Sequence, residues 1–347
     1  MAPAKKVSQI ELAKELGISQ ALVSLVLNGR RTGISPETYA RVWAHASKRG
    51  YLPKGMRFAA APASRPRQVG FILRAPLRLH TQSVYFGLVQ HGMHTALESL
   101  GLNTVFLGSE DLLDVEKLGR LFETGHAYKG VVLLGEVSRP FFNQLREFER
   151  RLVIVSARIP GLCHSVLGNE PQALDVLVRH LADLGHRRIG WLGGNLGLGT
   201  HASRLSAFKA ALKTRELELN ERYCLSFENA DRAVGIEAVQ AVAGFAARKD
   251  FPTAFVCYNT LMAAGAVLAF GTIGIKVPRD LSVCAADLSP LASTENPKIT
   301  ASGTSPDKLG EAAARLIMDT TGSEDESFTD LMLPSQLFVG DTTGEAR

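Results

Sequence analysis

Short apolar runs that alternate with helical patterns dominate most of this 347-residue chain. Helical periodicity is clear at 84–100, 171–185 and 260–273. Continuous apolar strands separated by helices are typical of a parallel sheet that is covered on both faces. The part of the chain after residue 67 is long for one such sheet, so we predict an α/β body of two doubly wound parallel-sheet lobes. A ligand crevice is expected at the carboxyl ends of the strands. The expected strands lie at 69–73, 103–108, 130–135, 152–157, 188–194, 253–259 and 280–287.

Residues 1–52, which we call the head, have the end signals of three short helices. Ser8 and Glu11 form a capping box for the first helix, and Pro36 suits the first position of the third. Helix, glycine turn, helix and a supporting helix make an all-α helix-turn-helix unit. The expected caps and terminating glycines are Ser8 with Gly17, Ser19 with Gly29, and Ser35 with Gly50.

The charge of the chain is concentrated in its first 67 residues. They hold 12 Lys and Arg against three acids, a net charge of +9, whereas the remaining residues carry −4. A basic segment joined to a mildly acidic body indicates a polyanion partner for that segment alone. Within it, Pro62 and Pro66 prevent a long helix, so residues 53–67 are expected to be a hinge or linker.

Several classes of protein are disfavoured by composition. The chain has no apolar run long enough for a signal peptide or a membrane span, so we expect a cytoplasmic protein without a membrane partner. The four cysteines lie far apart in sequence, without the close pairs that metal sites favour. We therefore predict no cofactor and no metal.

Several motifs in order along the chain resemble the LacI/GalR family of bacterial transcription regulators. They are VSQIELAKELGISQALVSLVLNG, ISPETYARVWAHASKRGYLP, LVRHLADLGHRRIGWLGG, PTAFVCYNTLMAAGAV, GIKVPRDLSV and LPSQLFVGDTTG. The resemblance implies a DNA-binding head (1–52), a hinge (53–67) and a periplasmic-binding-protein-like body (68–347) that dimerises and binds a small effector between its lobes. It also implies that the first lobe comprises about 68–164 and 303–325, and the second about 165–302 and 326–340.

The second helix of the head divides into a core face and an outer face. A helical wheel places Leu22, Val23, Val26 and Leu27 on one arc, which should pack inward. The resemblance implies that Gln20, Ala21 and Leu25 meet base edges, although many relatives have arginine in place of Leu25. Leucine offers only apolar contact, for instance to a thymine methyl group. The alternative is that Leu25 belongs to the core of the head. Expected phosphate contacts are Ser19, Ser24, Asn28, Ser35 and Thr38.

The segments after this helix depart from the family pattern. The loop is one residue longer and contains Arg30 and Arg31, which we expect to contact phosphate. In the hinge, Ala60 stands where relatives insert a leucine into the minor groove, and alanine is a poor wedge. Either Met56 or Phe58 takes that role, or the hinge bends DNA less strongly.

The resemblance also nominates residues for the effector cleft. Arg204, Asn259 and Asp287 match an arginine, an amide and an acid of sugar-binding relatives, and Ser83, Tyr85 and Phe86 match a first-lobe contact. Ser156, Thr260 and Gly168 stand where relatives have acids, and Ala230 where they have an aromatic platform. Fewer carboxylates mean fewer acceptors for hydroxyl groups, so the effector is expected to be sugar-like, smaller, anionic or absent. The alternative is that Arg204 and Asp287 only pair to hold the lobes.

The resulting prediction is a sequence-specific transcriptional regulator, a repressor, that binds a palindromic operator in double-stranded DNA as a homodimer. A small ligand in the cleft would modulate it. Two other readings are a nucleotide-dependent oxidoreductase and a cytoplasmic ligand-binding protein. The first rests on GGNLGLG, where Ala202 takes the place of the last glycine. No set of nucleophile, base and orienting acid stands out, so we predict no enzyme.

Overall fold

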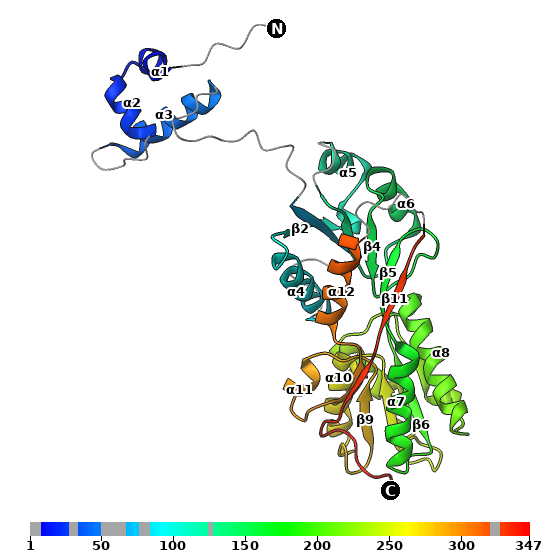
Figure 1. The fold of residues 1–347 in the computed structure, drawn as a ribbon. Helices are drawn as coiled ribbons and strands as arrows, with labels where there is room; N and C mark the ends of the chain where they lie inside the picture. The colour runs from blue at the N-terminus through cyan, green and yellow to red at the C-terminus, as the bar shows by residue number, and fades with distance from the viewer. Residues whose placement is uncertain (1–7, 28–33, 50–66, 76–83, 124–127, 320–326) are drawn as a thin grey trace. The chain divides into compact units, whose positions relative to one another are not determined.

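In the computed structural model, the chain divides into two compact units, Met1–Arg65 and Pro66–Arg347. The first unit contains the head and the second contains the body (Figure 1). The structure describes residues 8–27, 34–49, 67–75, 84–123, 128–319 and 327–347.

The head forms its helices where the end signals place them. Ser8 caps α1, since its hydroxyl oxygen accepts the N–H of Glu11 and the Glu11 carboxylate accepts the N–H of Ser8. Gly17 ends α1 in the left-handed region, with φ +66°, which glycine adopts without strain. The prediction of three short helices is confirmed, with α1 at Gln9–Leu16, α2 at Gln20–Leu27 and α3 at Pro36–Lys48.

The helices of the head pack around a small apolar core. Val23, Val26 and Leu27 of α2 are buried and Leu22 packs against them, as the helical wheel predicts. Leu12 of α1 and Val42 of α3 complete the contact from either side. At the surface, the Glu15 carboxylate accepts hydrogen bonds from His45 and Arg49, which lower its pKa. The core fixes which face of α2 remains outside.

The first lobe of the body is built on a parallel six-stranded sheet in the order β11-β5-β4-β3-β1-β2. Neighbouring residues of a strand point to opposite faces, so Phe71 packs under α4 and α12 whereas Ile72 packs under α5 and α6. This lobe consists of β1 (Gln68–Leu73), α4 (Val84–Glu98), β2 (Asn103–Ser109), η1 (Glu110–Leu112), α5 (Val115–Phe122), β3 (Val131–Leu134), α6 (Arg139–Phe148), β4 (Leu152–Val155), β5 (His164–Gly168), α12 (Pro306–Asp319) and β11 (Asp330–Leu333).

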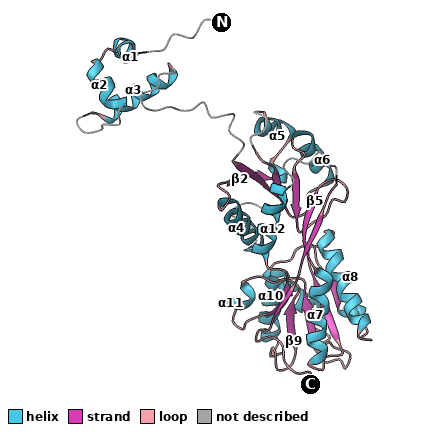
Figure 2. Cartoon of the chain, in the orientation of Figure 1, coloured by secondary structure: helices cyan, strands magenta, loops and turns pink. Residues whose placement is uncertain are grey.

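The second lobe has a sheet in the order β12-β10-β9-β8-β6-β7, in which only the β10–β12 pair is antiparallel among the described strands. Its core contains the fully buried Trp191 stacked on Phe208. Helices flank both sheets (Figure 2). This lobe consists of α7 (Glu170–Asp183), β6 (Ile189–Gly193), α8 (Gly199–Thr214), η2 (Glu221–Tyr223), β7 (Cys224–Ser226), α9 (Arg232–Ala243), β8 (Ala254–Cys257), α10 (Thr260–Thr272), β9 (Ser282–Ala285), α11 (Leu291–Thr294), β10 (Thr300–Gly303) and β12 (Gln336–Phe338).

The chain passes between the lobes at three places, two of which differ from the sequence prediction. Residues 164–168 form β5, which pairs with β4 of the first lobe, so the first crossing follows Gly168 and the boundary near 164 is wrong. The second crossing follows Gly303. Residues 330–333 form β11, which pairs with β5, so the last crossing follows Leu333 and the boundary near 326 is wrong. Both strands extend the first sheet because its edge offers unpaired backbone groups.

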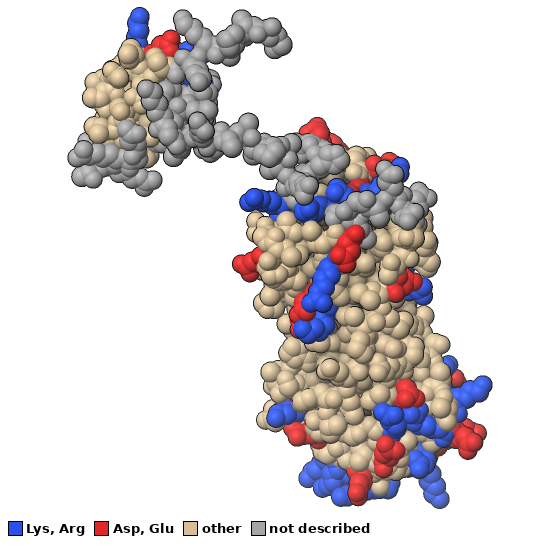
Figure 3. All heavy atoms as spheres, in the orientation of Figure 1, with Lys and Arg blue, Asp and Glu red and all other residues tan. Residues whose placement is uncertain are grey.

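Charges of both signs are mixed on the visible face of the described body (Figure 3). On the face shown in Figure 3, acidic and basic side chains lie next to one another instead of forming a patch of one sign. Across the described ranges, no helix combines the length and the apolar character needed to cross a membrane.

Candidate DNA-reading helix and interlobe cleft

The outer face of α2 presents few groups that can form hydrogen bonds. Gln20, Ala21 and Leu25 are exposed, whereas Ser24 is half-buried. Leu25 is 39% exposed and lies outside the apolar core of the head, so the alternative that it is a core residue is wrong. Of the three candidate base readers, only Gln20 can form hydrogen bonds to a base edge through its side chain.

Three of the described candidates for phosphate contact, Ser19, Ser35 and Thr38, stand at the starts of helices, whereas Ser24 lies within α2. The Ser19 hydroxyl oxygen accepts the N–H of Leu22 at 3.2 Å at the start of α2. The Ser35 hydroxyl accepts the N–H of Thr38 at 3.2 Å and donates to the Thr38 hydroxyl at 2.8 Å at the start of α3. The start of a helix favours anions, which agrees with a phosphate role for these residues. Asn28, Arg30, Arg31 and Ala60 lie outside the described residues.

The exposure of Leu25 leads to a prediction that separates its effect on base recognition from its effect on the stability of the head. Leu25→Ala should change the free energy of unfolding of the head by no more than about 0.5 kcal/mol, since surface changes have small effects. It should weaken DNA binding at one or two base positions. Leu12→Ala is the control, because truncating that fully buried side chain should lower the free energy of unfolding by about 2–5 kcal/mol. Binding to a library of single-base variants, with thermal unfolding of each protein, measures both effects. A large loss of stability in Leu25→Ala with unaltered base preference contradicts the prediction.

The body contains a cavity of about 800 Å³ between its lobes. Side chains from the carboxyl ends of strands and the starts of helices line it, as expected for doubly wound sheets. Ser83, a further sequence candidate, lies outside the described residues. The other nominated effector residues all border this cavity, and they are Tyr85, Phe86, Ser156, Arg204, Asn259 and Asp287.

Arg204, on α8, is held by an acid that the sequence analysis did not nominate. Its guanidinium donates Nε–H and Nη2–H to the two carboxylate oxygens of Glu170 at 3.0 and 3.1 Å. Its Nη1–H donates to the carbonyl oxygen of Tyr258 at 2.9 Å, and the guanidinium lies 4.6 Å from the centre of the Tyr258 ring. Burial lowers the pKa of Arg204, but Glu170, Tyr258 and Asp287 together more than offset this, and the pKa is raised overall.

Asp287 does not pair with Arg204, so that alternative is wrong. One Asp287 carboxylate oxygen accepts both the N–H and the hydroxyl of Thr260 at 2.6 Å, at the start of α10. Burial raises the pKa of Asp287, and the nearby charge of Arg204 partly counteracts it. Thr260 thus positions the carboxylate of Asp287.

Asn259 is committed to the fold at both ends of its amide. The side-chain oxygen accepts the N–H of Met262 at 2.9 Å and caps α10. The side-chain nitrogen donates to the carbonyl oxygen of Ala230 at 2.7 Å. One N–H of the amide nitrogen is left for a ligand.

Two first-lobe residues form a second polar pair at the cavity. The hydroxyl groups of Tyr85 and Ser156 lie 2.9 Å apart. Burial raises the pKa of Tyr85, with Ser156 counteracting it. Ser156 has φ +59°, a left-handed conformation that is strained for serine and often found at binding sites.

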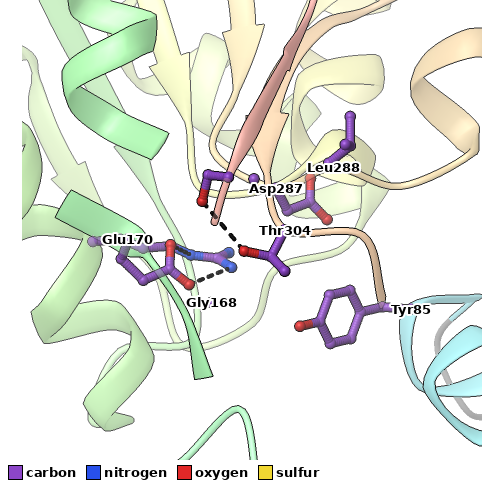
Figure 4. A pocket seen from close by; sticks show the side chains of 9 residues that line it. Tyr85, Gly168, Glu170, Asp287, Leu288 and Thr304 are labelled. Atoms are coloured by element: carbon purple, nitrogen blue, oxygen red, sulfur yellow. Dashed lines mark hydrogen bonds and ion pairs between the residues drawn. The ribbon is translucent and has the colours of Figure 1, made fainter. Parts of the chain in front are cut away.

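Figure 4 shows the polar junction where the chain passes between the lobes. Gly168 and Glu170 come from the first crossing, Thr304 from the second and Ser335 from the third. The hydroxyl groups of Thr304 and Ser335 lie 3.3 Å apart. The ion pair of Glu170 and Arg204 therefore lies beside all three crossings. An aspartate at position 168 would be crowded, since a Cβ there would lie 3.0 Å from the Thr304 hydroxyl oxygen.

Sequence reasoning missed Glu170 although a signal for it existed. Asn169 caps α7 through the N–H of Gln172, and Glu170 follows it directly in the first turn, where acids are favoured. A second missed acid, Glu136, accepts the N–H of Gly199 at 2.7 Å across the cleft. No pattern in the sequence connects Glu136 with Gly199, since only the packing of the two lobes brings them together.

Comparisons with known proteins agree with this architecture. A family model described as a periplasmic binding protein-like domain matches residues 178–343. The chain is 25% identical over 321 residues to the HTH-type transcriptional repressor PurR of Yersinia enterocolitica, which covers 91% of each chain. Its fold is similar to that of the transcriptional regulator CelR in complex with cellobiose (TM-score 0.67, 22% identity, 97% of this chain and 100% of the other). It is also similar to the Lac repressor dimer bound to operator and the anti-inducer ONPF (TM-score 0.68, 18% identity, 98% and 100%).

Proposed function

Because the chain belongs to the LacI/GalR family of bacterial transcription regulators, we propose that it is a ligand-modulated repressor that binds a palindromic operator in double-stranded DNA as a homodimer. The observation that carries this proposal is α2, a helix that follows a tight glycine turn and leaves Gln20, Ala21 and Leu25 outside the core. Such a helix placed in the major groove reads base edges.

The basic charge of the first 67 residues supports the same proposal. Cationic side chains that neutralise phosphates give affinity and position, while the outer face of α2 supplies what base readout there is. With one glutamine as the main reader, specificity should rest also on thymine methyl groups, DNA shape and the pairing of half-sites. We assign residues 1–52 to the head, 53–67 to the hinge and 68–347 to effector binding and dimerisation.

We further propose that a small effector occupies the cleft and shifts the orientation of the lobes. The coupling between effector and operator must be reciprocal, so operator DNA changes the affinity for the effector by the same factor. The protein is proposed to act in the cytoplasm and to have no catalytic activity, as its curated relatives are transcriptional regulators.

A gel-shift titration of the full chain on the DNA upstream of its own gene tests the proposal. One short, roughly palindromic site should bind at least about a thousandfold more tightly than a scrambled duplex at the same salt concentration. Gln20→Ala should reduce this ratio and leave the affinity for the scrambled duplex unchanged. Equal affinity for both duplexes would refute a sequence-specific regulator.

The loop arginines should add affinity without specificity. A double variant, Arg30→Gln with Arg31→Gln, should flatten the slope of log K against log salt concentration by about one to two units. The reason is that DNA binding releases fewer counterions when phosphate contacts are lost. Its ratio of operator to scrambled-duplex affinity should stay unchanged. A change in that ratio with an unaltered slope would mean that these arginines read bases.

A further inference from the structure

The cavity between the lobes exposes apolar side chains that the fold itself does not cover. Val84 is 47% exposed, Leu196 is 54% exposed and Met332 is 52% exposed, and all three line the cavity. They come from α4 of the first lobe, the loop before α8 of the second lobe, and β11. Exposed apolar groups gathered in a concave site are typical of a pocket for a ligand with an apolar body.

The polar groups expected to bind sugar hydroxyls are largely satisfied within the protein. Arg204 donates to Glu170 and to Tyr258, and one oxygen of Asp287 accepts two bonds from Thr260. The Asn259 amide caps α10 and reaches Ala230, and the hydroxyl groups of Ser156 and Tyr85 bond to each other. A sugar needs paired donors and acceptors around most of its hydroxyl groups once water is excluded, and these nominated residues use most of theirs within the protein.

Arg74 is the cation of the cavity that lacks an ion-pair partner among the described residues. It follows β1, is half-buried, and donates one hydrogen bond, at 3.1 Å, to the carbonyl oxygen of Ala75. Burial lowers its pKa, although the carboxylates of Glu136 and Glu110 act in the opposite direction. Both carboxylates accept hydrogen bonds from backbone N–H groups. Glu110 accepts them from Ala75 and Ser138, and Glu136 accepts one from Gly199.

The same part of the cavity already holds a carboxylate group. Glu136 reaches across the cleft to the start of α8, a 16-residue helix that has no side-chain cap at Leu198. The positive end of that helix and the charge of Arg74 both favour an anion here. The Glu136 carboxylate already occupies that helix end, so the guanidinium of Arg74 is the group left to pair with a carboxylate from a ligand.

We propose that the effector is an amphipathic organic acid with an aromatic or branched body. Its carboxylate pairs with Arg74 and its apolar body covers Val84, Leu196 and Met332. This inference rests on the proposed function, since it assigns a ligand class to the cleft of a regulator. The planar guanidinium suits a carboxylate, with which it forms two parallel hydrogen bonds.

Titration calorimetry on the full-length protein with matched probes tests this assignment. The acids are benzoate, phenylacetate, 3-phenylpropionate and 2-oxoisovalerate, the neutral counterparts are benzamide and phenylacetamide, and the sugars are glucose and cellobiose. At least one acid should bind ten times more tightly than both amides and than either sugar. Tighter binding of a sugar, equal binding of acid and amide, or no binding by any of the acids would overturn the proposal.

Two variants show whether Arg74 is the group responsible. Arg74→Gln should weaken binding of that acid at least tenfold and leave amide binding unchanged. Arg158→Gln is the matched control, because Arg158 lines the same cavity but is paired with Asp330, and it should keep the wild-type affinity. Circular dichroism and thermal unfolding report whether each variant is folded. Wild-type affinity in a folded Arg74→Gln variant would refute the role of Arg74.

The DNA titrations described above separate this proposal from the function on which it rests. Without any acid, Arg74→Gln should bind the upstream duplex as the wild type does. Operator binding without binding of any acid would refute the ligand class alone. Acid binding without sequence-specific DNA binding would refute the regulator and leave the chemistry of the cavity standing.

Discussion

Replacing Gly265 with alanine is expected to lower the free energy of unfolding of the body by about 3 kcal/mol, the upper end of what overpacking usually costs. Helices α9 and α10 approach each other here through their backbones. A Cβ at Gly265 would lie 2.1 Å from the carbonyl oxygen of Arg232, and a Cβ at Gly235 would lie 2.2 Å from that of Met262. Neither neighbour is the flexible end of a side chain, so whole helices must move apart. Guanidinium unfolding, with the slope compared between variants, measures the loss.

Gly271 is the control for this prediction, because it belongs to the same helix and has open space around it. Gly271→Ala should leave the stability unchanged or raise it by up to about 1 kcal/mol, since alanine reduces the entropy of the unfolded chain. Equal losses in both variants would show that the close approach is not the cause.

The first lobe uses the same arrangement. A Cβ at Gly92 of α4 would lie 2.0 Å from the carbonyl oxygen of Asp307, and a Cβ at Gly310 of α12 would lie 1.9 Å from that of Val89. Each lobe therefore has a pair of helices that cross on facing glycines. The role of these glycines is explained only by the partner helix, because a glycine inside a helix is otherwise unfavourable.

Glu170→Gln is expected to cost about 3–5 kcal/mol of stability, because it leaves the Arg204 guanidinium buried without its counter-charge. The side chains of Arg204 and Glu170 are only 10% and 19% exposed, so water cannot replace the lost partner. For a body of this size the loss should lower the melting temperature by roughly 6 °C or more. Differential scanning calorimetry of the full chain measures it.

Two further variants separate burial of the charge from loss of a hydrogen bond. Adding Arg204→Met to Glu170→Gln should restore part of the stability, since an uncharged pair needs no hydration. Glu221→Gln is the matched control, because its partner Lys209 also lies on α8 but that pair is exposed, at 46% and 72%, and should contribute about 1 kcal/mol or less. If Glu170→Gln costs no more than Glu221→Gln, Arg204 must have found another acid.

The long, strongly apolar elements follow from the sequence because the signals that define them are local. The apolar runs at 69–73 and 254–257 form buried strands, and Ser8 and Gly17 bound the first helix. The short strands at 164–168 and 330–333 are not predicted, because most of their residues are partly buried or exposed and their patterns are weak. Their pairing decides where the chain passes between lobes, which is why two of the boundaries were wrong.

The candidate site also combines features that follow from the sequence with features that depend on tertiary contacts. Motif positions brought Arg204, Asn259 and Asp287 to one cavity, and the helical wheel placed Leu25 outside the core. The partners of those residues came from elsewhere, since neither Glu170 nor Glu136 stands near its partner in sequence. Glu170 is 34 positions from Arg204, and Glu136 is 63 positions from Gly199.

The sequence by itself determined the local features of this protein: three capped helices in a basic head, the buried strands of an α/β body, and the outer face of α2. Capping, periodicity and charge act over a few residues, so they can be read from the chain alone. Only the tertiary structure decided which side chains pair in the cleft. Ion pairs, close helix crossings and exposed apolar linings depend on which distant segments meet. Arg204 is therefore held by Glu170, and Arg74 is left as the cation of the cavity without a partner among the described residues.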